Sequence, residues 1–193
     1  MSAKKRADRE LRTGVVSVVM VNYRGAEDTI TCLRSFEHVD WPADRLEMVV
    51  VENASGDDSA KRIRGAVPEA VVIEASSNTG FAGGCNLGVA NATGEYIAFI
   101  NNDARPAPGW LAAAVETLSS DQRIGCIASK VIDWDGKLVD YVDGSLTWFG
   151  MGYKREVERP DSPDYGVAKD VLFGTGAAMF VRTEVFRAVG GFD

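Results

Sequence analysis

Short apolar runs alternate along the chain with segments in which apolar residues recur every three or four positions. The first run, residues 15–21, is an almost continuous series of β-branched and apolar residues, which is typical of a strand buried on both faces. Glu27 and Asp28 follow, and their carboxylates suit the first turn of a helix. Apolar residues at helical spacing from Ile30 to Phe36 then predict one buried helix face.

This alternation continues to about residue 131. Further strands are predicted at 48–51, 71–73, 96–100 and 124–131. Helices are predicted at 57–66, from the glycine-rich segment to residue 92, and at 110–118. Strands that alternate with helices indicate right-handed βαβ units. We therefore predict an α/β, Rossmann-like fold whose mainly parallel sheet is covered by helices on both faces.

The character of the chain changes after residue 131. Residues 133–166 mix aromatic residues, Asp-Gly pairs and prolines, which are turn and loop signals. Residues 170–181 return to strand character, and 182–191 predict a capped helix. Because the chain stops just after this helix, we expect a truncated protein. We also expect the strand and helix at the end of the chain to expose apolar side chains such as Phe173, Phe186 and Phe192.

Composition and charge narrow the class of protein. The 193 residues fit one domain, and 46% hydrophobic with 25% charged residues is near the globular average. The net charge is −7, although residues 1–12 hold five basic and two acidic side chains and are predicted to form a disordered basic tail. An acidic body argues against nucleic acid as the partner, because phosphate neutralisation needs a basic surface. It suits a protein that recruits divalent cations.

Cysteine usage and hydropathy indicate the compartment. Cys32, Cys85 and Cys126 are far apart and odd in number, and His38 is the only histidine, so a zinc site is disfavoured. We predict three buried reduced thiols, a surface position for His38 and a cytoplasmic protein. No apolar run approaches the ~20 residues that span a bilayer. A peripheral contact of the basic tail with the inner face of the plasma membrane stays open.

Polar side chains gather where the predicted strands end. In chain order they are Asn22, Tyr23 and Arg24, then Glu52, Asn53, Ser55 and Asp57, then Asn78, Gly80, Gly84 and Asn86, and last Asn101, Asn102 and Asp103. A single polar strand end is a turn, and four independent turns are one interpretation. Four such ends at the carboxyl edge of a parallel sheet favour a ligand site instead.

The glycine-rich segment has two interpretations. Gly80, Gly83 and Gly84 either let backbone amides approach a phosphate at a helix N-terminus or allow close packing of the helix. A dinucleotide-binding GxGxxG is absent after the first strand, and no GKS or GKT marks a P-loop.

Four stretches together carry a family resemblance. They are VSVVMVNYRG, VVVENASGDDS, NTGFAGGCNLGVANATGEYIAFINNDARP and GTGAAMFVRTEVFRAVGGFD. Their order over residues 15–193 resembles glycosyltransferase family 2, and within it the bacterial rhamnosyltransferase-like branch. The resemblance implies an inverting enzyme of the nucleotide-binding GT-A fold. It further implies a UDP- or dTDP-sugar donor, a glycan or lipid-linked acceptor, a nucleotide-sugar-binding half at 13–132 and an acceptor-side half at 133–193.

The resemblance also assigns residues. Asn22, Tyr23, Glu52 and Asn53 would hold the nucleoside, with Ser55 and Asp57 shaping that pocket. Asn78, Gly80, Gly84 and Asn86 would border the donor. Asp103 would bind Mg²⁺ or Mn²⁺ on the diphosphate, with Asn101 and Asn102 supplying neutral contacts. Asn101 replaces the first Asp of the family's Asp-x-Asp motif, and Glu52 stands where Asp is commoner. The general base, a Glu-Asp motif in the family, would lie beyond Asp193.

Alternatives remain at several points. The chain could be a catalytically incomplete nucleotide-sugar-binding fragment, or a nucleotidyltransferase, although residues 21–28 lack the glycine-rich basic loop of that class. Arg182 could touch the acceptor or a phosphate, or cap a helix at the surface. Trp148 and Phe149 could line an acceptor cleft, but we expect them to pack in the core.

Overall fold

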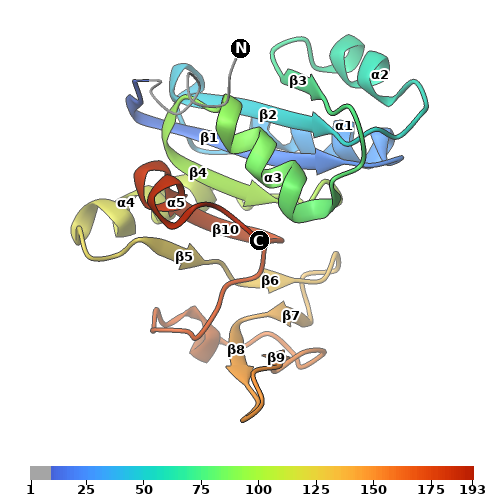
Figure 1. The fold of residues 1–193 in the computed structure, drawn as a ribbon. Coiled ribbons are helices and arrows are strands. Elements are labelled where there is room, and N and C mark those ends of the chain that lie inside the picture. The colour runs from blue at the N-terminus through green and yellow to red at the C-terminus, as the bar shows by residue number, and fades with distance from the viewer. Residues whose placement is uncertain (1–9) are drawn as a thin grey trace.

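The computed structural model describes residues 10–193 and contains one six-stranded sheet with a smaller lobe beside it (Figure 1). The strand order in the main sheet is β3-β2-β1-β4-β10-β5. These strands span Val71–Glu74 (β3), Leu46–Glu52 (β2), Arg12–Asn22 (β1), Gly94–Ile100 (β4), Ala178–Arg182 (β10) and Cys126–Ala128 (β5). The helices span Ala26–Ser35 (α1), Ser59–Ala66 (α2), Gly80–Asn91 (α3), Trp110–Ser120 (α4) and Thr183–Val189 (α5). Short 3₁₀ turns cover Phe36–His38, Ala43–Arg45 and Pro163–Gly166.

The sheet is mainly parallel, as the sequence predicts. β1 pairs in parallel with β2 on one side and with β4 on the other, and β3 adds to the outer edge of β2. β10 is antiparallel to both β4 and β5. The carboxyl ends of the four parallel strands therefore meet at one edge, and the register pairs Asn22 directly with Glu52 there.

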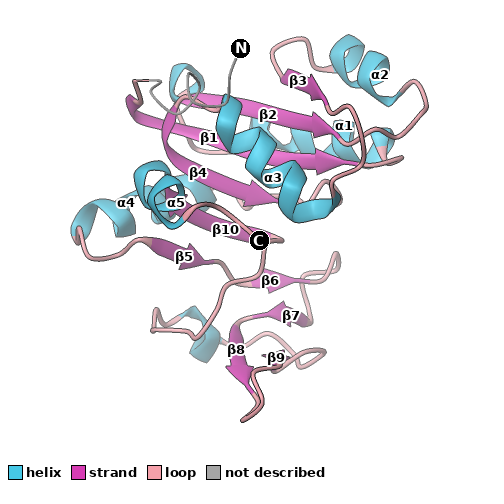
Figure 2. Cartoon of the chain, in the orientation of Figure 1, coloured by secondary structure: helices cyan, strands magenta, loops and turns pink. Residues whose placement is uncertain are grey.

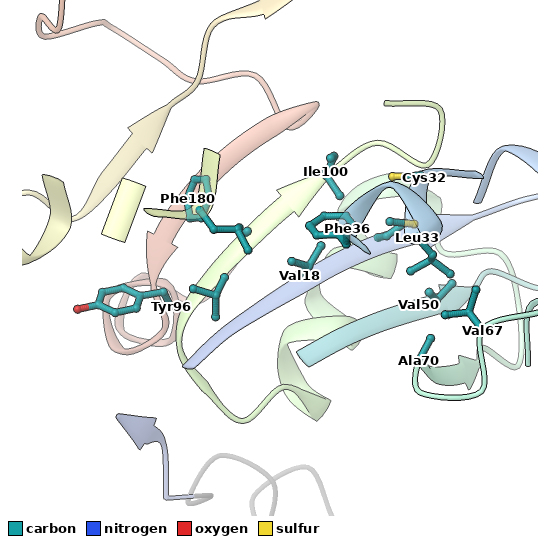
Figure 3. Close-up of a cluster of buried hydrophobic side chains, with 14 of the residues drawn as sticks. Val18, Cys32, Leu33, Phe36, Val50, Val67, Ala70, Tyr96, Ile100 and Phe180 are labelled. Atoms are coloured by element: carbon teal, nitrogen blue, oxygen red, sulfur yellow. The ribbon is translucent and has the colours of Figure 1, made fainter. Parts of the chain in front are cut away.

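Helices cover both faces of the sheet (Figure 2), which confirms the predicted layering. On one face, side chains of α1, α2 and α4 pack against strand residues such as Val18, Val50 and Phe180 (Figure 3). On the other face, α3 and α5 pack against Val19 and Phe99. The β-branched run of β1 thus contributes alternate residues to both layers, which is why it reads as continuously apolar.

α3 lies unusually close to the sheet. A Cβ atom at Gly84 would come within 2.9 Å of Val21, and one at Gly88 would come within 2.4 Å of Val19. At these two positions the glycines serve close helix packing, which is the second interpretation of this segment. Gly80 differs, because its φ is +71° and nothing lies within 4 Å of the position of its Cβ.

Two predicted strands are shorter than expected. The single strand at 124–131 is instead β5 and β6 (Val131–Ile132), separated by Ser129 and Lys130, because β5 finds partners on β10 only over Cys126–Ala128. Residues 170–177 are not strand, and β10 begins at Ala178. In both cases the chain turns between the sheet and the lobe, and that turn ends the pairing.

The lobe holds β6, β7 (Val139–Tyr141) and the hairpin of β8 (Asp143–Leu146) and β9 (Gly152–Arg155). Trp148 and Phe149 lie at the tip of this hairpin and are 95% and 60% exposed. The expectation that they pack in the core is therefore wrong. Tyr141 is buried and donates its hydroxyl to the carbonyl of Phe173, which ties the lobe to the segment before β10.

The last residues of the chain do not expose the apolar surface that the sequence suggests. Phe186 is buried, and the rings of Phe99, Phe186 and Phe192 lie between 5.1 and 5.3 Å apart. Phe173 and Phe192 are half-buried. Such a three-ring contact stabilises the end of the chain against the sheet by more than area burial alone.

The cysteines follow the prediction only in part. Cys32 and Cys85 are buried, and burial raises the pKa of each thiol to about 12. Cys126 is exposed, so the prediction of three buried thiols is wrong at this position. His38 is exposed, as predicted.

The structure tests little of the predicted N-terminal tail and its membrane contact. Residues 1–9 of the predicted 1–12 tail lie outside the described residues, and Arg12 already belongs to β1. Within residues 10–193 no helix is long and apolar enough to cross a membrane.

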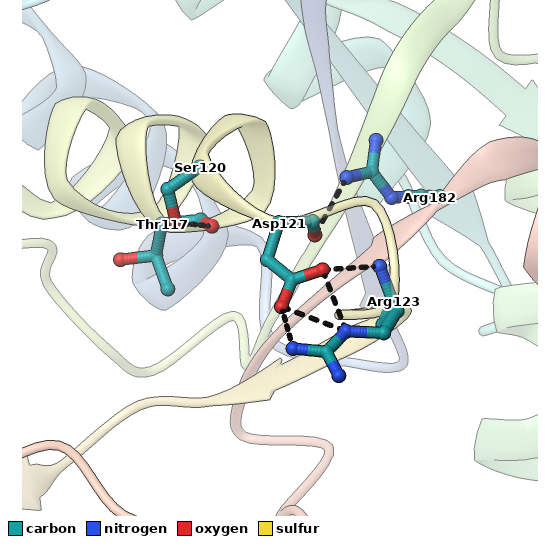
Figure 4. A network of polar contacts seen from close by, with 5 residues as sticks. All are labelled: Thr117, Ser120, Asp121, Arg123 and Arg182. Atoms are coloured by element: carbon teal, nitrogen blue, oxygen red, sulfur yellow. Dashed lines mark hydrogen bonds and ion pairs between the residues drawn. The ribbon is translucent and has the colours of Figure 1, made fainter.

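Arg182 has neither of the roles considered from the sequence. Its side chain is only 4% exposed and donates to the carbonyls of Leu118, Asp121 and Ile124, at and just after the C-terminal end of α4. Figure 4 shows the bond to Asp121. The carbonyls of Leu118 and Asp121 are at the helix end, which leaves its last carbonyls without intrahelical donors. The buried guanidinium therefore fastens α4 to β10.

We predict that Arg182→Met lowers the free energy of unfolding by about 2–4 kcal/mol, because several buried carbonyls lose their donor. Arg123 is the matched control, since its side chain is 91% exposed and its pairing with Asp121 is at the surface. Arg123→Met should leave the free energy of unfolding close to that of wild type, because a surface ion pair contributes little. Urea unfolding of both variants measures the difference, and equal losses would contradict the role assigned to Arg182.

Candidate functional site

The polar residues predicted as a site lie along the carboxyl edge of the parallel strands. Asn22 ends β1, Glu52 ends β2, and Asn101 follows β4. The backbone N–H of Asn53 donates to the carbonyl of Asn22 at 2.9 Å. The ends of β1 and β2 therefore remain hydrogen-bonded one residue beyond the end of β2. Asn22, Glu52 and Asn53 are all buried. Buried polar groups need partners, and these partners decide how the edge is built.

Asn22 is fully buried and bonded within the protein. Its Oδ1 accepts from the hydroxyl of Thr29 at 2.9 Å and from the N–H of Gly25 at 3.3 Å. Asn102 Nδ2 donates to the same Thr29 hydroxyl at 3.2 Å. One threonine on α1 therefore links the end of β1 with the loop after β4. These hydrogen bonds of Asn22 and Asn102 stabilise the carboxyl edge of the sheet.

Gly25 is required by this arrangement. A Cβ atom at Gly25 would come within 2.8 Å of Asn102 Nδ2. The glycine of the quoted VNYRG stretch thus leaves room for a side chain that arrives from another strand.

Glu52 and Ser55 form the second part of the edge. Glu52 Oε1 accepts from the N–H of Ser55 at 2.8 Å, and Ser55 Oγ accepts from the N–H of Arg24 at 2.9 Å. The guanidinium of Arg24 lies 5.1 Å from the ring centre of Tyr23, which is 45% exposed. Tyr23 is the large aromatic side chain that is exposed to a ligand at the ends of β1 and β2.

Backbone strain marks the same two turns. Arg24 and Ala54 have φ values of 57° and 59°, in the left-handed region that non-glycine residues rarely adopt. Each such residue costs of order 1–3 kcal/mol, and strain of this kind persists where neighbouring bonds enforce it. Here the bonds of Ser55 to Arg24 enforce it, because Ser55 O also accepts from Arg24 Nε at 3.3 Å.

Asn53 holds the loop that precedes α3. Its Nδ2 donates to Asn78 Oδ1 and to the carbonyl of Gly80, both at 3.0 Å, and its Oδ1 accepts from the N–H of Thr79 at 3.1 Å. Asn78 Oδ1 also accepts from the N–H of Gly80 at 2.8 Å. Asn53 and Asn78 therefore stand together, as the sequence predicts, and Gly80 lies at the open end of the loop.

Two predicted residues lie at the margins of the site. Asp57 is exposed and accepts from the N–H of Ser59 at 2.9 Å. The hydroxyl of Ser59, and after it this N–H, lower the pKa of the Asp57 carboxyl by hydrogen bonding. Asn86 exchanges two hydrogen bonds with the backbone of Phe192, at 2.8 and 2.9 Å. The amide of Asn86 thus anchors the end of the chain.

Asp103 lies in a cleft rather than among the buried asparagines. Its residue is exposed, and it lines a cleft of about 1300 Å³ between the loop after β4 and the lobe. The ring of Phe81 forms part of the wall and lies against Gly176, where a Cβ atom would come within 2.7 Å of the ring. The negative charge of Asp103 is also the second cause, after burial, of the raised pKa of Cys32.

The cleft contains residues that the sequence does not point to. Lys130 pairs with Asp161 at 2.8 Å, Lys154 pairs with Asp140 at 2.7 Å, and Arg105 lies 5.5 Å from the ring centre of Trp134. These pairs join segments far apart in the sequence, so spacing gives no signal for them. The one available signal is Trp134 itself, an aromatic residue between two aspartates in a predicted loop. Thr29 was missed because it is a polar residue within an amphipathic helix.

A divalent cation fits this edge only with help from a substrate. Among residues 10–193 no three His, Cys, Asp or Glu side chains gather closely enough to hold a metal ion. Asp103 offers a single carboxylate, and Asn102, whose Nδ2 donates to Thr29, offers at most its neutral Oδ1. Mg²⁺ is often bound by one or two carboxylates together with substrate phosphates, and that is the arrangement which these residues could support.

Comparisons with known proteins identify the family of this chain. The family model described as glycosyl transferase family 2 matches residues 17–190. The glycosyltransferase AglE of Haloferax volcanii is 26% identical over 184 residues, covering 92% of this chain and 55% of the relative. An uncharacterised glycosyltransferase of Mycobacterium tuberculosis is 28% identical over 197 residues. The match covers 90% of this chain and 72% of the length of that relative. The O-antigen biosynthesis protein RfbC of Myxococcus xanthus is 32% identical over 116 residues, which cover 56% of this chain and 9% of RfbC.

Solved structures share the fold at low sequence identity. The mannosyltransferase PcManGT from Pyrobaculum calidifontis, in complex with GDP-Man and Mn²⁺, has a TM-score of 0.66 and 22% identity, covering 99% of this chain and 53% of that one. S. aureus TarS 1–349 in complex with UDP-GlcNAc has a TM-score of 0.63 and 17% identity. The match covers 91% of this chain and 47% of the TarS chain. The chain spans about half the length of AglE and of these structures. The family match over most of the chain and the shared architecture show that it belongs to glycosyl transferase family 2 and has the GT-A fold.

Proposed function

We propose that this chain binds the nucleotide-sugar donor of an inverting glycosyltransferase, which transfers a sugar to a hydroxyl of a glycan or lipid-linked acceptor. The observation that carries the proposal is the hydrogen-bonded edge in which Asn22, Glu52, Asn53 and Asn102 join the strand ends. The names of the structural relatives support it, since PcManGT is in complex with GDP-Man and TarS with UDP-GlcNAc. The Asn101-Asn102-Asp103 sequence supports the rhamnosyltransferase-like branch.

In this proposal the nucleoside lies over the ends of β1 and β2. Tyr23 offers an exposed ring for the base, and Glu52 accepts its imide N–H with the carboxylate oxygen that Ser55 leaves free. Uracil and thymine carry such an N–H, which supports UDP or dTDP as the carrier. Asn22, Ser55 and Asn102 hold these groups in place through their own bonds.

The diphosphate would lie between the loop at Gly80 and Asp103. Gly80 has open space where a side chain would stand, so a phosphate can approach the N-terminus of α3, although the N–H of Gly80 itself already donates to Asn78 Oδ1. Asp103 would hold Mg²⁺ or Mn²⁺ against the diphosphate, and the bound cation would offset the charge that grows on the leaving group. Asn101 and Asn102 would add little charge, so the substrate would carry most of the ion's remaining ligands.

The acceptor hydroxyl needs a general base, and the cleft carboxylates are poor candidates. Hydrogen bonds from the N–H groups of Leu138 and Lys137 lower the pKa of Asp133, which weakens it as a base. Asp140 is paired with Lys154. We therefore assign neither Asp133 nor Asp140 as the base, and our proposal for this chain is donor binding. We also propose a cytoplasmic location, supported by three free cysteines.

We predict metal-dependent binding of a nucleoside diphosphate at Asp103. In calorimetry with Mn²⁺, Asp103→Asn should weaken UDP or dTDP binding by at least about tenfold, or about 1.4 kcal/mol. Without the metal, the two proteins should bind equally. Asp135→Asn, at an exposed position of the lobe, is the control and should behave as wild type. Equal Mn²⁺-dependent affinity in Asp103→Asn and wild type would remove Asp103 from the site.

We predict that Glu52 selects the base. Wild type should prefer UDP to CDP and ADP, because only uracil among these bases donates an imide N–H to a carboxylate. Glu52→Gln should reduce this preference by roughly tenfold, the effect of losing one charge-assisted hydrogen bond. Competition binding with the three nucleotides measures it. An unchanged preference in the variant would show that Glu52 does not contact the base.

We predict that Thr29 positions the site without touching the ligand. Thr29→Val keeps the shape of the side chain and removes the hydroxyl that joins Asn22 to Asn102, so unfolding free energy should fall by about 1–3 kcal/mol and nucleotide affinity should fall with it. Thr117→Val is the control, because its exposed hydroxyl bonds only within α4 to Ala113. Normal nucleotide affinity in Thr29→Val would contradict the positioning role.

A further inference from the structure

The tip of the β8–β9 hairpin is an apolar projection at the end of the lobe (Figure 1). Trp148 is 95% exposed, Phe149 is 60% exposed and Met151 is 62% exposed. The rings of Trp148 and Phe149 stand edge to face, with centres 5.3 Å apart. Soluble surfaces rarely group exposed aromatic residues in this way without a binding function.

The hairpin below the tip is held firmly, so the tip keeps a fixed direction. Phe173 lies against the hairpin at Gly144 and Gly152, where Cβ atoms would come within 2.5 and 3.3 Å of its ring. The turn is closed by bonds of Thr147 with Gly150 and Met151. Phe173 thus covers one face of the strands, whereas residues 147–151 extend past it.

The charges around the tip suit a neutral interface. No residue between Asp143 and Lys154 is charged. At the base, Asp143 pairs with Lys169 at 3.0 Å and with Arg155 at 3.6 Å, and Lys154 pairs with Asp140 at 2.7 Å. An apolar tip above a ring of paired charges matches the change from hydrocarbon to headgroups at a bilayer surface.

We propose that residues 147–151 insert into the interface of a lipid bilayer. Two strand residues cover about 7 Å, which agrees with the roughly 5–10 Å depth of interfacial insertion. A second copy of the chain suits the tip less well. Trp148 and Phe149 would bury on the order of 300–500 Å², which falls short of the roughly 800 Å² per partner of a stable interface.

The insertion has a consequence for the proposed acceptor. Lys154 of β9 and Asp140 of β7 line the cleft that also contains Asp103. The same hairpin therefore carries the membrane tip and part of the cleft wall. With the tip inserted, that wall lies at the bilayer surface, where a lipid-linked acceptor presents its hydroxyl. The choice of a lipid-linked acceptor rests on the proposed function. The membrane contact itself is independent of that function.

The experiment measures binding of the 193-residue chain to large phosphatidylcholine vesicles by flotation. Wild type should bind, and Trp148→Ser with Phe149→Ser should partition at least roughly tenfold more weakly, because two buried rings are lost. Val167→Ser with Leu172→Ser is the control, since these exposed apolar residues lie in the lobe outside the hairpin. This control should bind as wild type does. The Trp148 emission should shift to the blue on binding in wild type.

Two further measurements separate the alternatives. A chain lacking residues 1–9 should bind neutral vesicles unchanged, and added phosphatidylglycerol should change binding little. No binding to neutral vesicles, binding that needs residues 1–9, or equal binding by the tip variant would each overturn the proposal, as would self-association through the tip without vesicle binding. Nucleotide affinity of the tip variant in solution should equal that of wild type, so failure of the membrane contact is distinct from failure of donor binding.

Discussion

The structure depends on the need of buried polar groups at the ends of parallel strands to find partners. Asn22 and Asn53 are almost fully buried at the edge of the sheet, where no further strand pairing is available. Each obtains its hydrogen bonds from a loop that follows another strand or opens a helix: Asn22 from α1, and Asn53 from the turn before α3. Leaving such a group without partners would cost about 1–3 kcal/mol. The edge is therefore rigid because the loops complete one another.

This constraint also explains where glycine is required. Gly25 leaves room for Asn102, and Gly84 and Gly88 let α3 lie against Val21 and Val19. If α3 were further from the sheet, the loop that Asn53 holds would move away with it. Packing of one helix thus determines the position of a loop that is proposed to face a phosphate. The strained φ values at Arg24 and Ala54 belong to the same edge, where they are balanced by the bonds of Ser55.

Prediction from the sequence succeeded where a pattern is local. The β-branched run of β1, the helical spacing in α1 and the polar strand ends all depend on neighbours in the chain, and the architecture follows from them. Prediction from the sequence failed where the neighbours of a residue in space belong to segments that are distant in the chain. Nothing near Arg182 indicates that it binds carbonyls at the end of α4, and nothing near Trp148 indicates that no element covers it. The cleft was missed for the same reason, because its ion pairs join segments that are far apart in the sequence, Lys130 with Asp161 and Lys154 with Asp140.

The cleft lies between the two parts of the chain, the sheet and the lobe. Its walls come from the loop after β4, which carries Asp103, and from β7 and β9 of the lobe, which carry Asp140 and Lys154. The hydroxyl of Tyr141 in β7 donates to the carbonyl of Phe173, in the segment that leads into β10, so this bond ties the lobe to the sheet. The buried guanidinium of Arg182 in turn fastens β10 to the end of α4. In the proposed function, a donor over the strand ends and an acceptor against the lobe meet beside Asp103. For transfer, such fixed geometry matters more than the identity of any single contact, because misplacement of reacting groups by 1 Å can cost about a hundredfold in rate.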